Sequence, residues 1–332
     1  MNMMRLTDEQ MAGQRLMVGF DGTEFNQDLK FLIDTIKVGG LVLFAQNIST
    51  PEQIKKLTSS IQAYALSCGQ PPLFIAIDQE GGQVARLKEP FTQFPGNPSM
   101  KDKKDAQDFA QTTAAELTSV GINMNFAPVM DVALKDAQSI MAGRSFGGDP
   151  AWVSSLGVTI IKHLQNNNIM AVAKHFPGIG RTTIDSHIDQ PCVDFSVSDL
   201  ESFDLLPFSA AIKHDVAGIM LSHILYKNID PDWPAGFSSL IARDMLRERM
   251  KYNGLVMTDD LDMGAVKKKY DIKTIIRQIL SAEIDLVLIC HKGPDIESAF
   301  NEILKRFNDC ATTKKKGEKS LKRIMRYKKR YI

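Results

Sequence analysis

Cysteine is scarce in this chain of 332 residues and follows no ligand spacing. The four cysteines lie far apart and form no CxxC pair; they are Cys68, Cys192, Cys290 and Cys310. Disulfide scaffolds are dense in cysteine and zinc knuckles need closely spaced cysteines, so four widely spaced ones argue against both classes. It is typical of free thiols in a reducing compartment.

Long apolar runs and an excess of one charge are also missing. No segment approaches the ~20 consecutive apolar residues of a membrane-spanning helix. The first ten residues lack the apolar core of a secretory signal. The 40 basic and 39 acidic residues give a formal net charge of +1, so no overall field points to nucleic acid. We therefore expect a cytoplasmic monomer with no membrane span and no nucleic-acid partner.

The motifs of common cofactor sites do not occur. The chain has neither the GxGxxG of dinucleotide-binding folds nor the GxxxxGK[ST] of phosphate-binding loops. The HExxH helix of zinc hydrolases is missing too, and the Gly81-Gly82 pair is too short to cradle a phosphate. We therefore expect no cofactor and no metal.

Eight short apolar runs recur along the chain, each bounded by glycine or polar residues. Their lengths suit strands, and nearly continuous apolarity is what parallel strands buried on both faces require. The predicted strands are Arg15–Phe20, Gly40–Phe44, Leu73–Gln79, Ile122–Val129, Ile169–Phe176, Ala217–His223, Gly254–Asp260 and Asp285–Cys290.

The segments between these runs have the periodicity and end signals of helices. Eight strands alternating with helices predict an α/β fold, a (β/α)8 TIM-type barrel in one domain over residues 1–332. A doubly wound open sheet is the alternative. The predicted helices cover residues 51–68, 102–120, 150–167, 198–214, 239–252, 271–283 and 294–308.

A strongly basic segment spans residues 314–330, where ten side chains are Lys or Arg. The favoured interpretation is a last helix at about residues 313–332, packed through its apolar residues and solvated on its basic face. A contact of this face with nucleic acid or an anionic surface is the alternative, for which two tyrosines offer the only aromatic interleaving.

Polar side chains gather where the predicted strands end. The third strand leads into Asp78, with Arg86 shortly after, and the fifth ends in Lys174 and His175. The seventh ends at Asp259 and its acidic neighbour. In a (β/α)8 barrel these strand ends meet at one face, which is where active sites lie. The same face would receive Asp131, Arg144, Ser222 and His223.

The loop after the fifth strand is the densest in proton-transfer groups. It follows Lys174 and His175 and then supplies Asp185 and His187. Carboxylates with Arg and Lys suit a polyhydroxylated ligand, because they accept from and donate to hydroxyl groups. Glycoside hydrolysis needs a carboxylate near the anomeric carbon and a proton donor. Asp259 is the candidate nucleophile, and His187, held by Asp185, is the candidate donor.

A metal centre is the weaker alternative at this face. Histidine and carboxylate are a usual ligand set for zinc, but neighbouring Arg and Lys side chains would repel a cation. The ligands would be His175, His187, His223 and Asp259.

At these residues the sequence resembles the β-N-acetylhexosaminidases of glycoside hydrolase family 3. It is most similar to the compact bacterial N-acetylglucosaminidases of peptidoglycan recycling. The resemblance runs from about Gln14 to the C-terminal helix. The segments that carry it are GGLVLFAQNI at 39–48, IAIDQEGGQVARL at 75–87, NFAPVMDV at 125–132, GRSFGGDP at 143–150, KHFPGIGRTTIDSH at 174–187 and GLVMTDDLDMGAV at 254–266.

The resemblance implies an exo-acting retaining enzyme that removes N-acetylglucosamine from muropeptides or related amino-sugar substrates through a covalent glycosyl-enzyme. Asp259 then matches the nucleophile, His187 the general acid/base and Asp185 its hydrogen-bond partner. The residues implied to hold the terminal sugar are Asp78, Arg86, Arg144, Lys174 and His175.

Three positions depart from the family pattern. Ile179 replaces a usual second histidine, Gln83 replaces a usual arginine, and Glu283-Ile284-Asp285 replaces the more usual Gly-Ala-Asp. We expect Ile179 to alter the hydrogen bonding of its loop and Gln83 to alter surface packing. A phosphorylase in which phosphate intercepts the intermediate, a glycosidase of other sugar specificity and a non-catalytic sugar-binding barrel are the alternative functions.

Overall fold

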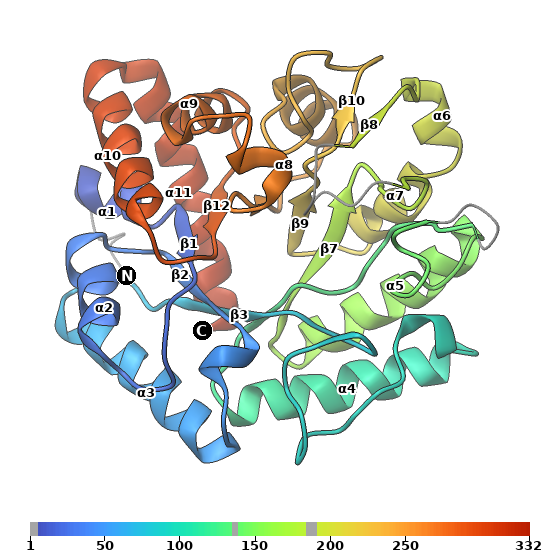
Figure 1. Cartoon of the computed structure of the whole chain (residues 1–332), viewed down its shortest axis with the longest axis horizontal. Coiled ribbons are helices and arrows are strands. Elements are labelled where there is room, and N and C mark those ends of the chain that lie inside the picture. The colour runs from blue at the N-terminus through green and yellow to red at the C-terminus, as the bar shows by residue number, and fades with distance from the viewer. Residues whose placement is uncertain (1–5, 135–138, 184–190) are drawn as a thin grey trace.

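Eight parallel strands form a closed barrel in the computed structural model, which describes residues 6–134, 139–183 and 191–332 (Figure 1). The order around the barrel is β1-β2-β3-β6-β7-β9-β11-β12, and β12 pairs with β1 to close it. The predicted (β/α)8 barrel is therefore confirmed, and the open-sheet alternative is wrong. The barrel strands are β1 (Leu16–Val18), β2 (Gly40–Leu43), β3 (Phe74–Ile77), β6 (Met124–Asn125), β7 (Met170–Phe176), β9 (Gly218–Leu221), β11 (Leu255–Asp260) and β12 (Leu286–Ile289).

Two short strand pairs lie outside the barrel. An antiparallel pair follows β3, and a parallel pair joins the segment after residue 190 to the segment after β9. Both pairs shape the loops that leave the C-terminal ends of the barrel strands. They are β4 (Gln79–Gly81) with β5 (Val84–Ala85), and β8 (Cys192–Val193) with β10 (Leu225–Tyr226).

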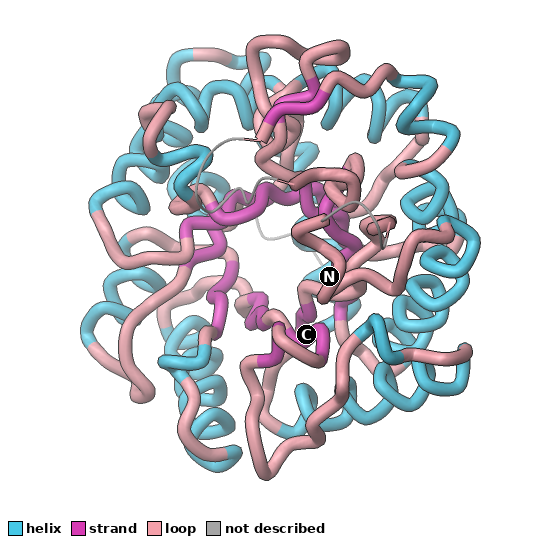
Figure 2. Tube along the Cα trace, turned by 45° about the vertical axis from the view of Figure 1, so that its right-hand side comes forward, coloured by secondary structure: helices cyan, strands magenta, loops and turns pink. Residues whose placement is uncertain are grey.

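Helices surround the strands, as the ring of cyan around the magenta strands shows (Figure 2). Each predicted helix is present, with ends that differ by up to about three residues and with two further differences described below. Among the described residues, no helix has both the length and the apolarity needed to cross a membrane. The longer helices are α3 (Pro51–Ser67), α4 (Lys103–Ser119), α5 (Pro150–Asn166), α7 (Leu205–Lys213), η4 (Leu240–Arg249), α9 (Ile272–Ser281), α10 (Pro294–Asp309) and α11 (Ala311–Tyr331). The short ones are α1 (Asp8–Gly13), α2 (Gln27–Lys30), η1 (Phe31–Thr35), η2 (Ala45–Asn47), η3 (Asn97–Ser99), α6 (Val197–Ser202) and α8 (Gly264–Lys267).

Two predicted helices differ in detail. The helix expected over residues 198–214 is two helices, α6 and α7, because the backbone leaves the helical region at Phe203, with φ −141° and ψ −73°. The turn between them directs Asp204 toward Arg181, with which it forms an ion pair. The segment over 240–249 is a π-helix, η4, whose last turn is closed by a bond from the N–H of Met250 to the carbonyl of Met245.

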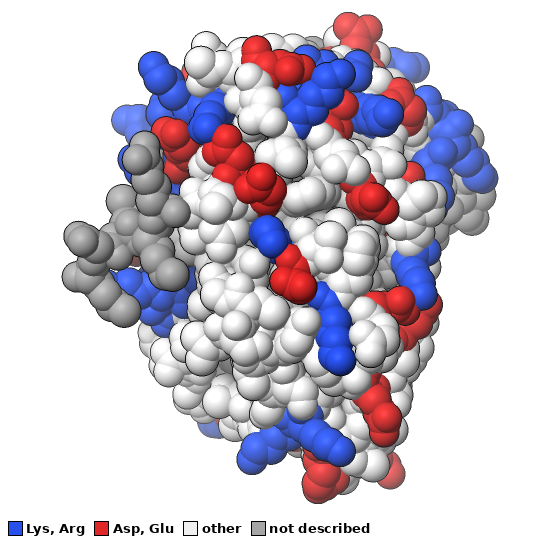
Figure 3. Space-filling view, turned by 90° about the vertical axis from the view of Figure 1, so that its left-hand side faces the viewer, with Lys and Arg blue, Asp and Glu red and all other residues white. Residues whose placement is uncertain are grey.

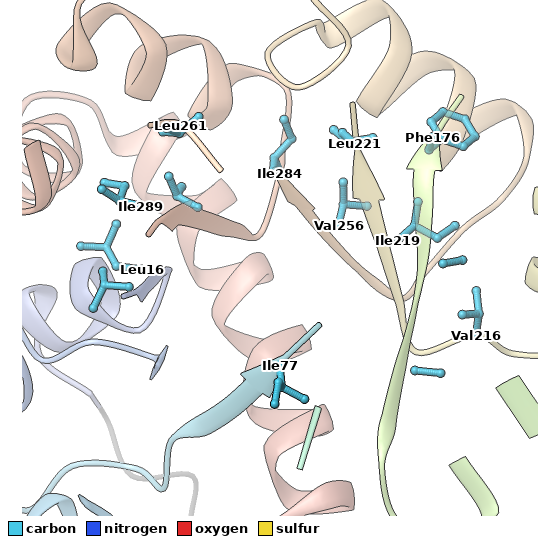
Figure 4. Packing of buried hydrophobic residues seen from close by; sticks show 14 of the residues in the cluster. Leu16, Ile77, Phe176, Val216, Ile219, Leu221, Val256, Leu261, Ile284 and Ile289 are labelled. Carbon is cyan, nitrogen blue, oxygen red and sulfur yellow. The ribbon is translucent and has the colours of Figure 1, made fainter. Parts of the chain in front are cut away.

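Alternate residues of each strand face opposite sides of the barrel wall. One set packs outward against the helices and includes Ile77, Ile219, Leu221 and Val256, whose side chains are drawn in Figure 4. The other set fills the barrel interior with large flexible side chains. This inner cluster includes Met17, Phe74, Met124, Met170, Met220 and Met257.

Helix α11 lies across the N-terminal ends of the barrel strands. Its Ile324 and Tyr331 side chains belong to the inner cluster of the barrel. Arg323 pairs with Asp285, just before β12, at 2.9 Å, and Lys328 donates from Nζ to Gln14, just before β1, at 2.6 Å. The expected last helix is thus confirmed, and its inner side closes the base of the barrel.

Candidate active site

A cavity of about 280 Å³ opens at the C-terminal end of the barrel. Apolar side chains from five segments form much of its wall, and carboxylates, one guanidinium and one imidazole provide its polar groups. The polar groups include Asp78, Arg86 and Asp259, which come from the predicted strand ends. The apolar wall includes Phe44, Phe126, Met220 and Met263.

Asp78 belongs to a network of five charged side chains. Lys174 Nζ lies 2.6 Å from Asp78 Oδ1 and 2.7 Å from Glu80 Oε1, and Arg86 Nη2 lies 3.3 Å from Asp78 Oδ2. Arg144 grips Glu80 with two hydrogen bonds, from Nε at 3.0 Å and from Nη2 at 2.7 Å. Such forked contacts fix orientation as well as charge. The network brings together Asp78, Arg86, Arg144 and Lys174, as the sequence predicts.

The charges of this network hold one another ionised. Burial alone would raise the pKa of Asp78, but Lys174 and Arg86 outweigh it and lower that pKa to about 2. Glu80 behaves in the same way, since burial is offset by Lys174 and Arg144 and its pKa falls. Burial would lower the pKa of Lys174, and the two carboxylates raise it instead. With three cations and two carboxylates, the network keeps one excess positive charge beside the cavity.

His175 is oriented by a buried carboxylate. Its Nδ1 lies 2.7 Å from Asp131 Oδ2, and its backbone N–H also points to that carboxylate, at 3.2 Å. A carboxylate accepts hydrogen bonds, so Nδ1 carries a proton and donates a hydrogen bond to Asp131. Nε2 is the ring nitrogen that Asp131 does not contact. The other Asp131 oxygen, Oδ1, accepts from the N–H of Ile179 at 2.8 Å. Asp131 therefore fixes both the imidazole and the start of the loop that follows β7.

Asp259 stands at the end of β11, half-buried, and lines the cavity together with Asp78 and Arg86. Its Oδ1 accepts the N–H of Asp260 at 2.8 Å. Asp260 is different, because burial raises its pKa to about 6 and its Oδ1 accepts from the N–H of Cys290 at 3.0 Å. His223 donates from Nε2 to the carbonyl of Asp260 at 3.0 Å, and burial lowers its pKa, so it is neutral near pH 7.

Comparison with known proteins assigns the chain to a protein family. Residues 6–327 match the glycosyl hydrolase family 3 N-terminal domain. The chain belongs to glycoside hydrolase family 3. A curated β-hexosaminidase of Nitrosomonas eutropha is similar to this family 3 chain, with 35% identity over 289 residues, which are 84% of this chain and 81% of the relative.

Two solved structures, the first of them described as a glycoside hydrolase family 3 enzyme, superpose on nearly the whole chain. A β-N-acetylglucosaminidase from Paenibacillus sp. str. FPU-7 gives a TM-score of 0.95 at 34% identity over 98% of this chain, which spans 63% of that longer protein. A β-N-acetylhexosaminidase from Beutenbergia cavernae gives 0.91 at 28% identity, over 97% of this chain and 98% of the other. This family 3 chain is a glycoside hydrolase of the β-hexosaminidase type.

The two residues predicted to transfer the proton, Asp185 and His187, lie outside the described residues. The described start of their loop is well fixed in this family 3 enzyme. Tyr226 donates its hydroxyl to the carbonyl of Gly178 at 2.7 Å, and the Ile179 side chain is 6% exposed in the core. The Ile179 departure therefore fills an apolar site, while its backbone N–H bonds to Asp131.

Gln83, the second departure, contacts the loop that carries Arg144. Its side chain amide lies so close to Gly143 that a Cβ there would stand 2.7 Å from Gln83 Nε2. The Gln83 side chain therefore packs against the residue next to Arg144. The third departure comprises Glu283 and Ile284, because Asp285 matches the family pattern. Glu283 lies 3.5 Å from Lys316 of α11.

Of the metal ligands considered from the sequence, His187 lies outside the described residues. The two described histidines already form other hydrogen bonds. His175 Nδ1 bonds to Asp131, and His223 Nε2 bonds to a carbonyl. Within residues 6–134, 139–183 and 191–332, a different group has ligand atoms within 4.8 Å of one another, namely Asp260, Asp262 and His291. Lys267 Nζ already lies 2.6 Å from Asp262 Oδ1, so a lysine ammonium group neutralises one carboxylate of this group.

Two residues with clear roles in the site were not among the predicted site residues. Glu80 lies two residues after Asp78, and residues i and i+2 of an extended segment share a face, so the spacing was a usable signal. Asp131 was noted only as a strand-end residue. Its role depends on His175, 44 residues later, and the sequence alone does not show that contact.

Proposed function

We propose that this family 3 glycoside hydrolase is a retaining exo-β-N-acetylglucosaminidase. Its substrates are muropeptide fragments or related β-linked amino-sugars, from which it removes a terminal non-reducing N-acetylglucosamine. The supporting observation is that Asp259 shares one small cavity with Asp78 and Arg86. The names of the Paenibacillus and Beutenbergia relatives support the same sugar specificity.

Among the carboxylates of the cavity, Asp259 is the one best suited to attack. Asp78 is held by Lys174 and Arg86, and Asp262 is held by Lys267. Within the described residues, no cation lies within ion-pair distance of Asp259. A carboxylate without a cation on its oxygens keeps its electron density for the anomeric carbon.

The size of the cavity supports exo action. Pockets for drug-sized ligands hold roughly 300–1,000 Å³, and this one holds about 280 Å³. That volume suits one sugar ring rather than several. Arg86 and Lys174 would donate to the hydroxyl groups of that ring, and Asp78 would accept from them.

The reaction then runs in two steps. In the first, Asp259 bonds to the anomeric carbon while His187 protonates the leaving oxygen, so that a covalent glycosyl-enzyme forms. In the second, His187 takes a proton from water, the water oxygen attacks the anomeric carbon, and Asp259 leaves. Asp185 would hold the imidazole of His187 throughout, as a carboxylate does in other acid/base pairs. We also propose that the barrel alone is sufficient for this chemistry.

The first experiment replaces the nucleophile. Asp259→Ala should abolish hydrolysis of an aryl β-N-acetylglucosaminide while urea unfolding shows a folded protein. Near-normal turnover of this variant would exclude Asp259 as the nucleophile. Glu248→Gln is a matched control, because Glu248 is exposed on η4 and has no ion-pair partner in the described residues.

The second experiment tests stereochemistry and specificity. NMR of the first product should show the β-anomer of N-acetylglucosamine, and an initial α-anomer would refute a retaining mechanism. Aryl glycosides of N-acetylglucosamine, glucose and xylose, assayed side by side, should show a preference for the first. Formation of a sugar 1-phosphate in phosphate buffer would instead identify the phosphorylase alternative.

A further inference from the structure

The charge of this protein is concentrated in one helix. Helix α11 carries ten basic residues and one acidic residue, Glu318, within 21 residues. The other 311 residues contain 30 basic and 38 acidic side chains, so they carry a formal net charge of −8 against +9 on α11. On the face drawn in Figure 3 the two signs occur together, with a broad uncharged area between them. A helix of this charge needs an explanation of its own.

Part of that charge serves the fold. On the inner side of α11, Lys314 lies 2.6 Å from Asp8, Lys316 lies 3.5 Å from Glu283, and Arg323 lies 2.9 Å from Asp285. Lys328 is buried against Gln14 and the ring of Phe74. The three ion pairs hold α11 against the base of the barrel.

Five of the six remaining cations form a line on the outer side. Their spacing of three or four residues places them on one face of the helix, over a length of about 21 Å. None of the four lysines in this line has an ion-pair partner among the described residues, and all of the line is exposed. We define this basic stripe as Lys315, Lys319, Lys322, Arg326 and Lys329.

The basic stripe leads into a recess of about 470 Å³ between α11 and the loops before β9 and β11. Lys251, Arg326 and Arg330 line this recess, together with Tyr327 and one carboxylate, Asp215. Arg326 is fixed there by a hydrogen bond from Nη2 to the carbonyl of Asn253 at 2.6 Å. The stripe thus ends in a concave site with three cations.

We propose that the basic stripe and this recess form a docking surface for a linear phosphodiester polymer without bases, of the glycerol phosphate type. A single row of cations matches the row of negative charges along such a chain, and Arg binds phosphate through forked hydrogen bonds. Each contact releases counterions from the polymer, which makes the affinity strongly salt-dependent. The proposal does not depend on the proposed function, because the docking surface lies at the other end of the barrel from the cavity.

Two other partners fit the surface less well. A membrane would meet a broad face, yet the rest of the protein carries −8, and the buried apolar side chains of α11 face the barrel and cannot insert. Single-stranded nucleic acid would need aromatic platforms for its bases. Tyr327 and Tyr331 stack on each other with ring centroids 6.3 Å apart, so they offer little free surface.

The test measures binding of a fluorescent glycerol phosphate oligomer of about a dozen units by anisotropy. With roughly five contacts, log K should fall with log salt concentration with a slope of about −3 to −4. Replacing the four stripe lysines, Lys315, Lys319, Lys322 and Lys329, by Gln should weaken binding at least about 100-fold. The matched control replaces four exposed lysines on other helices by Gln, namely Lys55, Lys56, Lys103 and Lys162.

The control variant has the same net charge as the stripe variant and should bind within about threefold of wild type. Both variants should hydrolyse an aryl substrate like wild type, which shows that each is folded. Equal weakening in both variants would overturn the proposal, since it would mean unspecific attraction. No binding at 50 mM salt, or tighter binding to phosphatidylserine vesicles or to single-stranded DNA of equal charge, would overturn it as well.

Discussion

The replacement Glu80→Gln tests the charge network most directly. Glu80 is 2% exposed, and its carboxylate receives both hydrogen bonds of Arg144 and one contact from Lys174. The amide keeps the shape of the side chain but removes its charge. Lys174 and Arg144 would then share the single carboxylate of Asp78 with Arg86.

The size of the effect follows from these contacts. Removing one partner of a buried ion pair costs about 3–5 kcal/mol. Lys174 keeps its 2.6 Å contact with Asp78, so we expect the lower end, about 3 kcal/mol of unfolding free energy. The amide offers Arg144 one neutral oxygen in place of two carboxylate oxygens, so the forked contact is lost. A displacement of ~1 Å of a binding group costs about 100-fold in kcat/KM.

Urea unfolding and steady-state kinetics on an aryl β-N-acetylglucosaminide measure the two effects. Because Arg144 is expected to hold the sugar before reaction, KM should rise more than kcat falls. Glu248→Gln removes an exposed carboxylate and should change neither quantity. A stability loss below about 1 kcal/mol together with unchanged kcat/KM would refute the view that Glu80 holds Arg144 and Lys174 in place.

Three further predictions concern buried charges. Because the pKa of Asp78 falls from its ordinary value to about 2, its stabilising effect is present above pH ~4 and is lost as pH falls toward 2. Between about pH 4 and pH 2, the unfolding free energy of wild type should therefore fall by up to about 2 kcal/mol because of this group. The Asp78→Asn variant should lack this part of the fall. Burial holds the pKa of Lys328 well below its ordinary value, so the unfolded chain binds the extra proton and stability rises with pH until the unfolded lysine deprotonates. Lys328→Met should raise the urea midpoint at pH 7 and flatten this rise. Asp285→Asn leaves Arg247 and Arg323 without their shared carboxylate and should cost about 3–5 kcal/mol, read from the same urea midpoints.

The barrel was predictable because its signal is local. Each strand is a short apolar run bounded by glycine or polar residues, and burial on both faces leaves this pattern in the sequence itself. The division between α6 and α7 was not predictable. The turn at Phe203 brings Asp204 to Arg181, 23 residues away, and a helical periodicity contains no information on such a contact.

The site shows the same limit. Strand-end positions identified Asp78, Arg86, Lys174 and Asp259, because barrel geometry brings all strand ends to one face. The sequence did not show which charge neutralises which. The contact between Asp78 and Lys174 spans 96 residues, and the pairing of Glu80 with Arg144 follows only once the barrel is closed.

The contacts of α11 also bear on the synthesis of this protein. Asp8 meets Lys314 across 306 residues of sequence, and Gln14 meets Lys328 across 314. At roughly 5–20 residues per second, the ribosome makes the partners about 15–60 s after these first segments. The edge of β1 must stay unpaired until β12 is made, and the lower mouth of the barrel must stay uncovered until α11 is made. We therefore expect the nascent chain to be most exposed to chaperones and proteases in this interval, and synthesis of α11 to end it.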